Sequence, residues 1–270
     1  MPEQTPVWFI TAASSGFAAV AFPKLANLKE NGAHVITLDV TSSLPEIEKV
    51  AKEANDKYGY ITHLVNAAGY ALIGAVEETS PKEDFDSFNT NVIGAINVTK
   101  AFLPYLRAHT GPRTICNFGS IASWTGGPGA ALYYSAKWAV SGFSEALHHE
   151  VAPFGIAVTV AEPGYFRTGF LNPGAAIQSA KRLDVYEQSA AGEVRRALGA
   201  TDGKQKGDVV KGSKILVDIL TSSGIAEGKK VPIRVALGSD SPPTIRDKMK
   251  ETEELLDEWD KVTMDTDHAD

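Results

Sequence analysis

The chain is 270 residues long, 43% of them hydrophobic, and it carries a formal net charge of −7. This composition can bury one large core, so we expect a single domain over residues 1–270. The acidic balance argues against nucleic acid or an acidic membrane as a partner. The lone Cys116 excludes an internal disulfide, and no leader peptide or apolar stretch of ~18 residues is visible. A cytoplasmic protein is the simplest expectation.

Short apolar runs alternate with helical patterns along the chain. The runs that we expect to be strands are 7–11, 34–38, 61–66, 113–118, 156–161 and 231–237. Helical stripes lie between them, with the clearest ones over 101–106 and 138–151. This repetition is typical of an α/β fold with a doubly wound, Rossmann-like parallel sheet that helices cover on both faces.

Two segments near the C-terminus are interpreted separately. The polar, Gly-rich stretch 192–212 is predicted to be a flexible segment, and a surface loop without a functional role is the alternative. The tail 242–260 is predicted to be an amphipathic helix, with Ile245, Met249 and Trp259 on its apolar face. Packing of this face on the sheet is the simplest account, and an oligomer contact or a lid over a substrate are the alternatives.

Tyr133 and Lys137 are the most informative pair of residues. They lie four positions apart, so both side chains project from one face of a helix. A nearby ammonium favours phenolate over phenol and lowers the pKa of the tyrosine. Tyr133 is therefore a candidate proton donor and acceptor for an alcohol and carbonyl pair.

Other motifs accompany this pair in a fixed order along the chain. Ser120 ends a strand in a Gly/Ser turn, thirteen residues before Tyr133, and Asn91 lies early in a predicted helix. Three further motifs sit where predicted strands end, at 11–16, 64–69 and 158–168. These six ordered motifs, spread over residues 7–168, resemble the short-chain dehydrogenase/reductase family.

The resemblance implies reversible hydride transfer between a nicotinamide cofactor and a carbon that bears oxygen. Tyr133 would protonate the carbonyl oxygen, and Ser120 would hydrogen-bond the same oxygen. Lys137 would hold the nicotinamide ribose and lower the pKa of Tyr133. Asn91 would fix a water that relays protons from Lys137 to solvent. The segment 237–240 is similar to family members that act on hydrophobic alcohols and ketones, which would be the substrates here.

The resemblance also implies a cofactor site at the carboxyl ends of the strands. NADP is the expected cofactor, with NAD as the alternative. The cofactor-binding residues would be Gly16, Asp39, Asn66, Gly69, Tyr133, Lys137, Pro163, Gly164 and Thr168. No metal is expected, because the six histidines show no ligand spacing such as HExxH. A serine hydrolase is disfavoured since no G-x-S-x-G elbow occurs.

The N-terminal part departs from the family pattern. Alanine stands at positions 12 and 18, where the family has glycines that let the backbone approach the pyrophosphate. Only 28 residues separate Thr11 from Asp39, too few for two crossovers. One crossover helix and one strand are therefore predicted to be missing, and the helix that fits lies over 23–32. If the strand 34–38 filled the vacant place, Asp39 could select NAD.

Two further interpretations remain open. The first is a relative with impaired cofactor binding, inactive as an enzyme and acting through protein contacts, or a truncated gene product. The second is an extended-type sugar-nucleotide epimerase, which shares the Tyr-x-x-x-Lys pair but is disfavoured by the segment 163–168.

Overall fold

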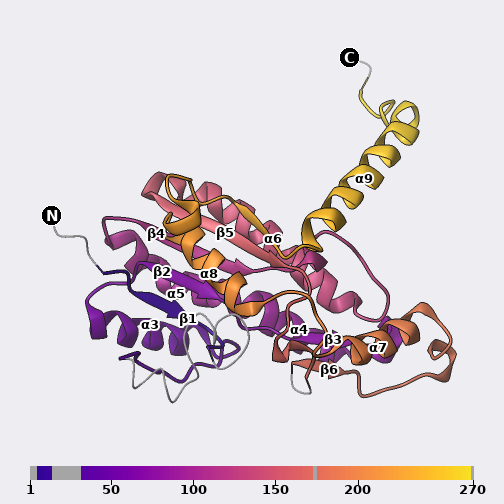
Figure 1. The fold of residues 1–270 in the computed structure, drawn as a ribbon, viewed down its shortest axis with the longest axis horizontal. Coiled ribbons are helices and arrows are strands. Elements are labelled where there is room, and N and C mark those ends of the chain that lie inside the picture. Colours follow the sequence, from indigo (N-terminus) through magenta and orange to yellow (C-terminus); the bar gives the residue numbers. More distant parts are fainter. Residues whose placement is uncertain (1–4, 14–31, 173–174, 269–270) are drawn as a thin grey trace.

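The computed structural model describes residues 5–13, 32–172 and 175–268. Five parallel strands form its central sheet, in the order β1-β2-β4-β5-β7 (Figure 1). They are β1 (Trp8–Ile10), β2 (His63–Asn66), β4 (Arg113–Phe118), β5 (Ile156–Pro163) and β7 (Arg234–Leu237). The predicted Rossmann-like parallel sheet is therefore confirmed.

Helices cover both faces of this sheet. On one face lie α3 (Leu44–Tyr58), α5 (Gly94–Ala108) and α6 (Ala131–Val151), whose apolar residues join the largest core cluster. On the other face, α8 (Val209–Leu220) packs through Leu216 and Leu220 (Figure 1). The remaining helices are α4 (Pro81–Phe88), α7 (Ala190–Thr201) and α9 (Ser241–Thr263).

The strands are apolar on both sides because both faces are covered. Leu64 and Ile115 belong to the cluster under α3 and α5, whereas Val65 and Cys116 belong to the cluster under α8. Successive side chains of a strand point to opposite faces. This is why the sequence shows continuous apolar runs here instead of an alternating pattern. Cys116 is buried, as expected.

The predicted strand over 34–38 is wrong. Residues 33–39 form no strand, and among the described residues β1 pairs only with β2. Ile36 and Leu38 instead pack against the main core cluster as partly buried side chains. These apolar side chains are buried by packing, without strand pairing. The segment therefore does not form the predicted strand beside β1. Most of the predicted helix over 23–32 lies outside the described residues.

The stretch 192–212, predicted to be a flexible segment, is helical in its first half. Its residues form most of α7, which begins after Ser189, whose hydroxyl accepts a hydrogen bond from the Ala191 N–H. A small parallel sheet, not predicted from the sequence, precedes this helix and joins β3 (Ala71–Ile73) to β6 (Ala176–Gln178). The segment after β5 (169–172 and 175–201), called the cover below, is thus ordered. It is attached to the body through the pairing of β6 with β3.

A buried ion pair fastens this cover to the body. Glu78, in the short helix η1 (Val76–Glu78), is fully buried and pairs with Arg195 of α7. Burial raises the pKa of Glu78, but hydrogen bonds from the Leu183 and Ala75 N–H groups and the Arg195 guanidinium outweigh it and leave the pKa lowered. The carboxylate is therefore charged at neutral pH and depends on these donors.

The helix α9 confirms the predicted amphipathic tail but does not pack on the sheet. It leaves the body after Ser241, which is buried, and projects outwards (Figure 1). None of the described helices is long and apolar enough to cross a membrane.

We expect Arg195→Leu to lower the free energy of unfolding by about 3 kcal/mol at pH 7, because it leaves the Glu78 charge buried without its partner. The lowered pKa of Glu78 stabilises the fold above the carboxyl's unfolded value of about 4.3, and this contribution is lost as the pH falls through the folded value. The difference between variant and wild type should therefore shrink in acid, as measured by urea unfolding at several pH values.

The matched control is Arg196→Leu, at the next position, where the side chain is half exposed. It should cost about 1 kcal/mol or less. Equal losses for the two variants would contradict a special role of the Glu78–Arg195 pair.

A second prediction concerns Ala12, which follows β1 with a φ of +54°. This left-handed conformation strains a residue with a Cβ, whereas glycine adopts it freely. Ala12→Gly should therefore raise the free energy of unfolding by roughly 0.5–1 kcal/mol. Ala13→Gly, beside it and without a positive φ, should give no gain. A loss of stability for Ala12→Gly would contradict the strain.

Candidate active site

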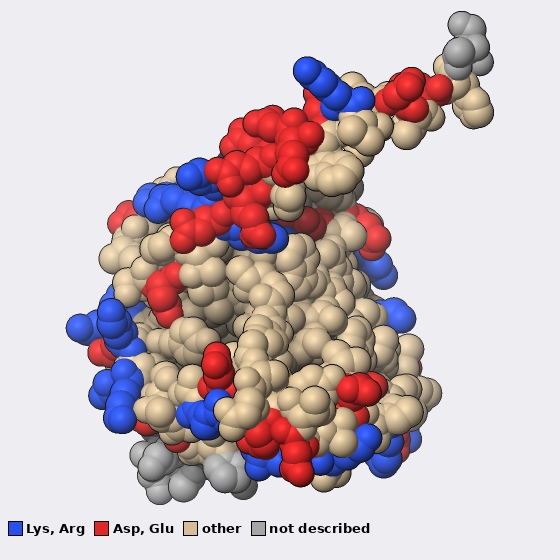
Figure 2. All heavy atoms as spheres, turned by 90° about the vertical axis from the view of Figure 1, so that its right-hand side faces the viewer, with Lys and Arg blue, Asp and Glu red and all other residues tan. Residues whose placement is uncertain are grey.

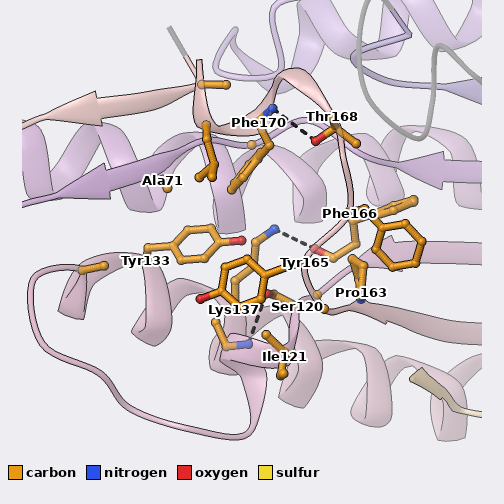
Figure 3. A pocket seen from close by; sticks show the side chains of 18 of the residues that line it. Ala71, Ser120, Ile121, Tyr133, Lys137, Pro163, Tyr165, Phe166, Thr168 and Phe170 are labelled. Carbon is orange, nitrogen blue, oxygen red and sulfur yellow. Dashed lines mark hydrogen bonds between the residues drawn. The ribbon is translucent and has the colours of Figure 1, made fainter. Parts of the chain in front are cut away.

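A cavity of about 250 Å³ opens at the carboxyl ends of β2, β4 and β5. This edge is where ligands bind in open parallel α/β sheets. Lys137 is the only charged residue among the described residues that line it. Most of the lining is apolar or aromatic, and Figure 3 shows Phe166 and Phe170 among these residues. The others include Ile73, Tyr134, Leu171 and Leu198. The cavity therefore suits an uncharged, apolar ligand.

Ser120 stands where β4 turns into a short helix. It is buried, and its hydroxyl oxygen accepts a hydrogen bond from the Ala122 N–H at 3.1 Å. Gly119 before it packs against β5 so closely that an added Cβ would lie 2.7 Å from Val160. The turn therefore holds the Ser120 hydroxyl in a fixed place on the cavity wall (Figure 3).

Tyr133 projects from the first turn of α6 into the same cavity (Figure 3). Its ring packs against Phe170, with centroids 5.8 Å apart. Burial raises the pKa of Tyr133 to about 12, and a hydrogen bond with the Ser120 side chain opposes that rise. Tyr133 is thus a phenol at neutral pH, and the predicted lowering of its pKa is wrong for this structure because burial dominates.

Lys137 lies one turn further along α6, as the spacing predicts. Its Nζ donates to the Phe118 carbonyl oxygen at 2.7 Å and lies 5.7 Å from the centroid of the Tyr133 ring. The side chain is buried, and this burial lowers the pKa of Lys137 to about 8. The Lys137 ammonium therefore lies buried next to the Tyr133 ring, and this burial costs solvation free energy.

Asn91 lies behind the cavity wall, in a π-helical turn (Asn89–Ile93) between α4 and α5. Its Nδ2 donates to the carbonyl oxygens of Tyr70 and Ser87, at 3.0 and 2.9 Å. Gly69 separates it from Lys137: a Cβ at position 69 would collide with Asn91 and lie 3.6 Å from Lys137 Nζ. The structure thus brings Asn91 close to Lys137, and the glycine permits it. π-Helical turns are frequent at functional sites.

The residues predicted to bind the cofactor fall into three groups. Gly69, Tyr133, Lys137, Pro163, Gly164 and Thr168 line the cavity. Asn66 is buried behind it, where Nδ2 donates to Thr99 and Asn117, and Asp39 is exposed and accepts hydrogen bonds from Thr41. Gly16 lies outside the described residues, as does Ala18.

Three positioning contacts were not predicted from the sequence. Thr11 joins the ends of β1 and β2, because its hydroxyl accepts from the Ala67 and Ala68 N–H groups. The position of Thr11 in the motif 11–16 was the sequence signal that could have indicated this contact. Asp240 accepts from the Tyr165 N–H at 2.8 Å and so fixes the segment after Pro163.

The third contact is a buried carboxylate next to the cavity. Glu162, at the end of β5, accepts hydrogen bonds from Trp124, Ser141 and Arg234. Burial raises the pKa of Glu162, against the hydrogen bonds and the Arg234 charge. Because Trp124 follows the Ser120 turn, this group ties the Ser120 turn to β5. Its members come from distant parts of the chain, so no local pattern could reveal it.

The buried cation makes a prediction about stability. The folded pKa of Lys137, about 8, lies below its ordinary value of 10.5. The unfolded chain therefore binds more protons between these values, and stability should rise with pH across that window. Lys137→Met should remove this rise and raise the free energy of unfolding at pH 7 by up to about 3 kcal/mol. Urea unfolding of both proteins at pH 7 and pH 10 measures this; identical pH profiles would contradict the burial of a charge.

Known proteins share this sequence pattern and geometry. A family model described as short chain dehydrogenase matches residues 7–176. The oxidoreductase BOA17 of Botryotinia fuckeliana is 31% identical over 258 residues, which cover 88% of this chain and 90% of that protein.

Two solved structures share the fold. A short-chain dehydrogenase from Streptomyces avermitilis superposes with a TM-score of 0.85 and 31% identity, covering 97% of this chain and all of that one. A short-chain dehydrogenase/reductase from Burkholderia phymatum, in complex with NAD, has a TM-score of 0.76 and 21% identity over 93% of this chain and 95% of that one. With the sequence match, the five-stranded parallel sheet and the cavity at its carboxyl edge, this chain belongs to the short-chain dehydrogenase/reductase family.

Proposed function

We propose that this chain is an NAD(P)-dependent oxidoreductase that interconverts an apolar alcohol with the corresponding ketone or aldehyde. The observation that carries the proposal is the pairing of the Tyr133 and Ser120 hydroxyls on the wall of an otherwise apolar cavity. Two hydroxyls that can share one ligand oxygen suit a carbonyl oxygen that gains negative charge.

Tyr133 is proposed as the acid and base of the reaction. Its raised pKa keeps the phenol protonated at neutral pH, so it can donate its proton to the substrate oxygen as the carbonyl is reduced. Ser120 holds the same oxygen by a hydrogen bond. In the alcohol-oxidising direction, the same proton moves back from the substrate hydroxyl to Tyr133.

The donor groups of the site fit a nicotinamide cofactor. Lys137 has three N–H donors, and the Phe118 carbonyl takes one, which leaves two for ribose hydroxyls. The Thr168 hydroxyl lies on the same wall and would hydrogen-bond the carboxamide group. When bound, the cofactor supplies or accepts the hydride at the substrate carbon. We propose NADP, with NAD as the alternative; Asp39, exposed after 33–38, remains a predicted contact for the adenosine side.

Proton relay from Tyr133 is proposed to run through Lys137 and Asn91. Gly69, which bears no side chain, lies between them, and a bridging water is proposed to complete the path. The depressed pKa of Lys137 lets it exchange a proton near neutral pH. Substrates are proposed to be uncharged, because the described lining offers no cation apart from Lys137 and no carboxylate.

Impaired cofactor binding is the second candidate. Ala12 holds a strained left-handed conformation at the cavity, where the family has glycine. Among the described residues, no strand lies beyond β1. Calorimetric titration with NADPH and then NADH separates the candidates: micromolar binding of either supports the oxidoreductase, and no binding to folded protein favours the impaired relative.

The decisive variant is Tyr133→Phe. It should lower kcat by at least about 100-fold, since it removes the proton donor, and it should leave cofactor affinity nearly unchanged. The matched control is Tyr134→Phe, at the next position on the same cavity wall, which should change kcat only a few-fold. Turnover of small apolar ketones, followed by NADPH absorbance, is the measurement. Equal activity of the two variants would remove Tyr133 from the proposed role.

A further inference from the structure

Glu162 is a buried carboxylate for which the proposed reaction has no use. Figure 2 shows acidic and basic side chains on the surface of one face of the molecule and along the projecting helix α9. Glu78 and Glu162, in contrast, are only 0% and 1% exposed. Glu78 holds the cover through Arg195, whereas Glu162 lies at the end of β5, directly before Pro163. Burial of a carboxylate costs solvation free energy, which its surroundings must offset.

Three donors from different parts of the chain surround the Glu162 carboxylate. Its Oε2 accepts from Trp124 Nε1 at 2.7 Å, and its Oε1 accepts from the Ser141 hydroxyl at 3.1 Å. Arg234 of β7 donates to Oε1 through Nη1 at 2.6 Å, and its guanidinium carbon lies 4.5 Å from the centroid of the Trp124 ring. All three partners donate, so the group between them must accept from each. An ionised carboxylate can do this, and an amide cannot.

Trp124 connects this carboxylate to Ser120. The short helix η3 (Ile121–Ser123) begins after Ser120 and ends at Trp124, whose backbone N–H donates to the Ile121 carbonyl oxygen at 3.1 Å. The Ser123 N–H donates to the Ser120 carbonyl oxygen at 2.8 Å. A single helical turn therefore links the indole that the carboxylate holds to the hydroxyl on the cavity wall.

Ser141 connects the same carboxylate to the helix that carries Tyr133. Tyr133, Lys137 and Ser141 recur at every fourth position of α6, so they lie along one side of this helix. Ser141 is 1% exposed and lies one turn beyond Lys137. Its bond to Glu162 therefore anchors the side of α6 that presents Tyr133 to the cavity.

The Ser120 turn and α6 also touch each other between these two bonds. The Ser123 hydroxyl donates to the Lys137 carbonyl oxygen at 2.9 Å. A Cβ at position 119, where the chain has glycine, would lie 3.0 Å from Ser123 Oγ and 3.2 Å from Ser141 Oγ. The turn and the helix are thus closely packed here, and a change in the position of either moves Ser120 relative to Tyr133.

We propose that Glu162 is a positioning residue for the reaction, because one carboxylate holds the Ser120 turn and the Tyr133 side of α6 at a fixed separation. The two hydroxyls can hold one substrate oxygen only while this separation is kept, and a misplacement of about 1 Å can lower a rate by about 100-fold. Glu162 is not among the described residues that line the cavity, so it acts through Trp124 and Ser141. The kinetic consequence rests on the proposed function, whereas the geometric one does not.

The kinetic test compares the same substitution at two positions. Trp124→Phe removes a donor to Glu162 but keeps an aromatic ring for Arg234, so the protein should fold. We expect kcat for the reduction of cyclohexanone, acetophenone or 2-octanone to fall about 10-fold, with the KM for NADPH unchanged. In the control, Trp138→Phe, the lost donor bonds the Thr125 carbonyl oxygen at 3.1 Å, and kcat should be kept. Equal losses in the two variants would overturn the proposal.

A double-mutant cycle tests whether Trp124 acts through Ser120. Trp124→Phe should lower kcat about 10-fold in the wild-type chain but less than about two-fold in Ser120→Ala, where no hydroxyl is left to position. Ser141→Ala, which removes the bond on the helix side, should also lower kcat. A general loss of structure would lower kcat equally in both backgrounds, so a full loss in Ser120→Ala would contradict the positioning role.

The geometric test is the crystal structure of each variant, which requires no activity. In Trp124→Phe the separation of the Ser120 and Tyr133 oxygens should change by about 0.5 Å or more, and in Trp138→Phe it should not change. Glu162→Gln, which offers the three donors one oxygen, should show the same change as Trp124→Phe. Unmoved oxygens in Trp124→Phe would overturn the proposal whatever the kinetics. A wild type that reduces none of the ketones, together with a changed separation, would instead reject the proposed function and support the positioning by Glu162.

Discussion

The buried ammonium of Lys137 is the constraint on which the active-site region depends. Moving this charge out of water costs solvation energy, as its lowered pKa shows. The fold offsets that cost with the Phe118 carbonyl at the end of β4 and with the face of the Tyr133 ring. Both partners are themselves fixed by neighbours: β4 by its ladders to β2 and β5, and the tyrosine by Phe170. The position of the cation therefore depends on the sheet, on α6 and on the cover at once.

The cover itself is organised by carboxylates rather than by apolar packing alone. Glu78 receives N–H donors from the segment around Leu183 and the guanidinium of Arg195, and Glu83 receives the Ala180 N–H. All three contacts join residues about 100 positions apart. A cover held by charge-assisted hydrogen bonds keeps a defined geometry over a cavity whose walls are mostly apolar.

The sequence predicted those parts of the fold whose signal is local. Strands buried on both faces appear as apolar runs, and the Tyr133 and Lys137 spacing holds because both lie on α6. The strand over 34–38 failed because Ile36 and Leu38 gain burial by packing without a ladder, which a hydrophobicity pattern cannot distinguish from pairing. The helix α7 was not predicted as such, because the stretch 192–212 is polar and rich in glycine, which indicated a flexible segment. Its Arg195 contact, with a residue 117 positions away, has no local signature.

The place of β1 at the edge of the described sheet has a consequence for how such proteins change over time. Doubly wound sheets grow outwards from their first strand in two directions, one half after the other. In the described part of this chain, β2, β4, β5 and β7 all lie to one side of β1, and they carry Ser120, Pro163 and the turn that supports Lys137. Among the described residues, the strands that position the reacting groups thus all lie on one side of β1. Insertions or deletions at the other side of β1 can therefore be inherited without disturbing the geometry of the reacting groups.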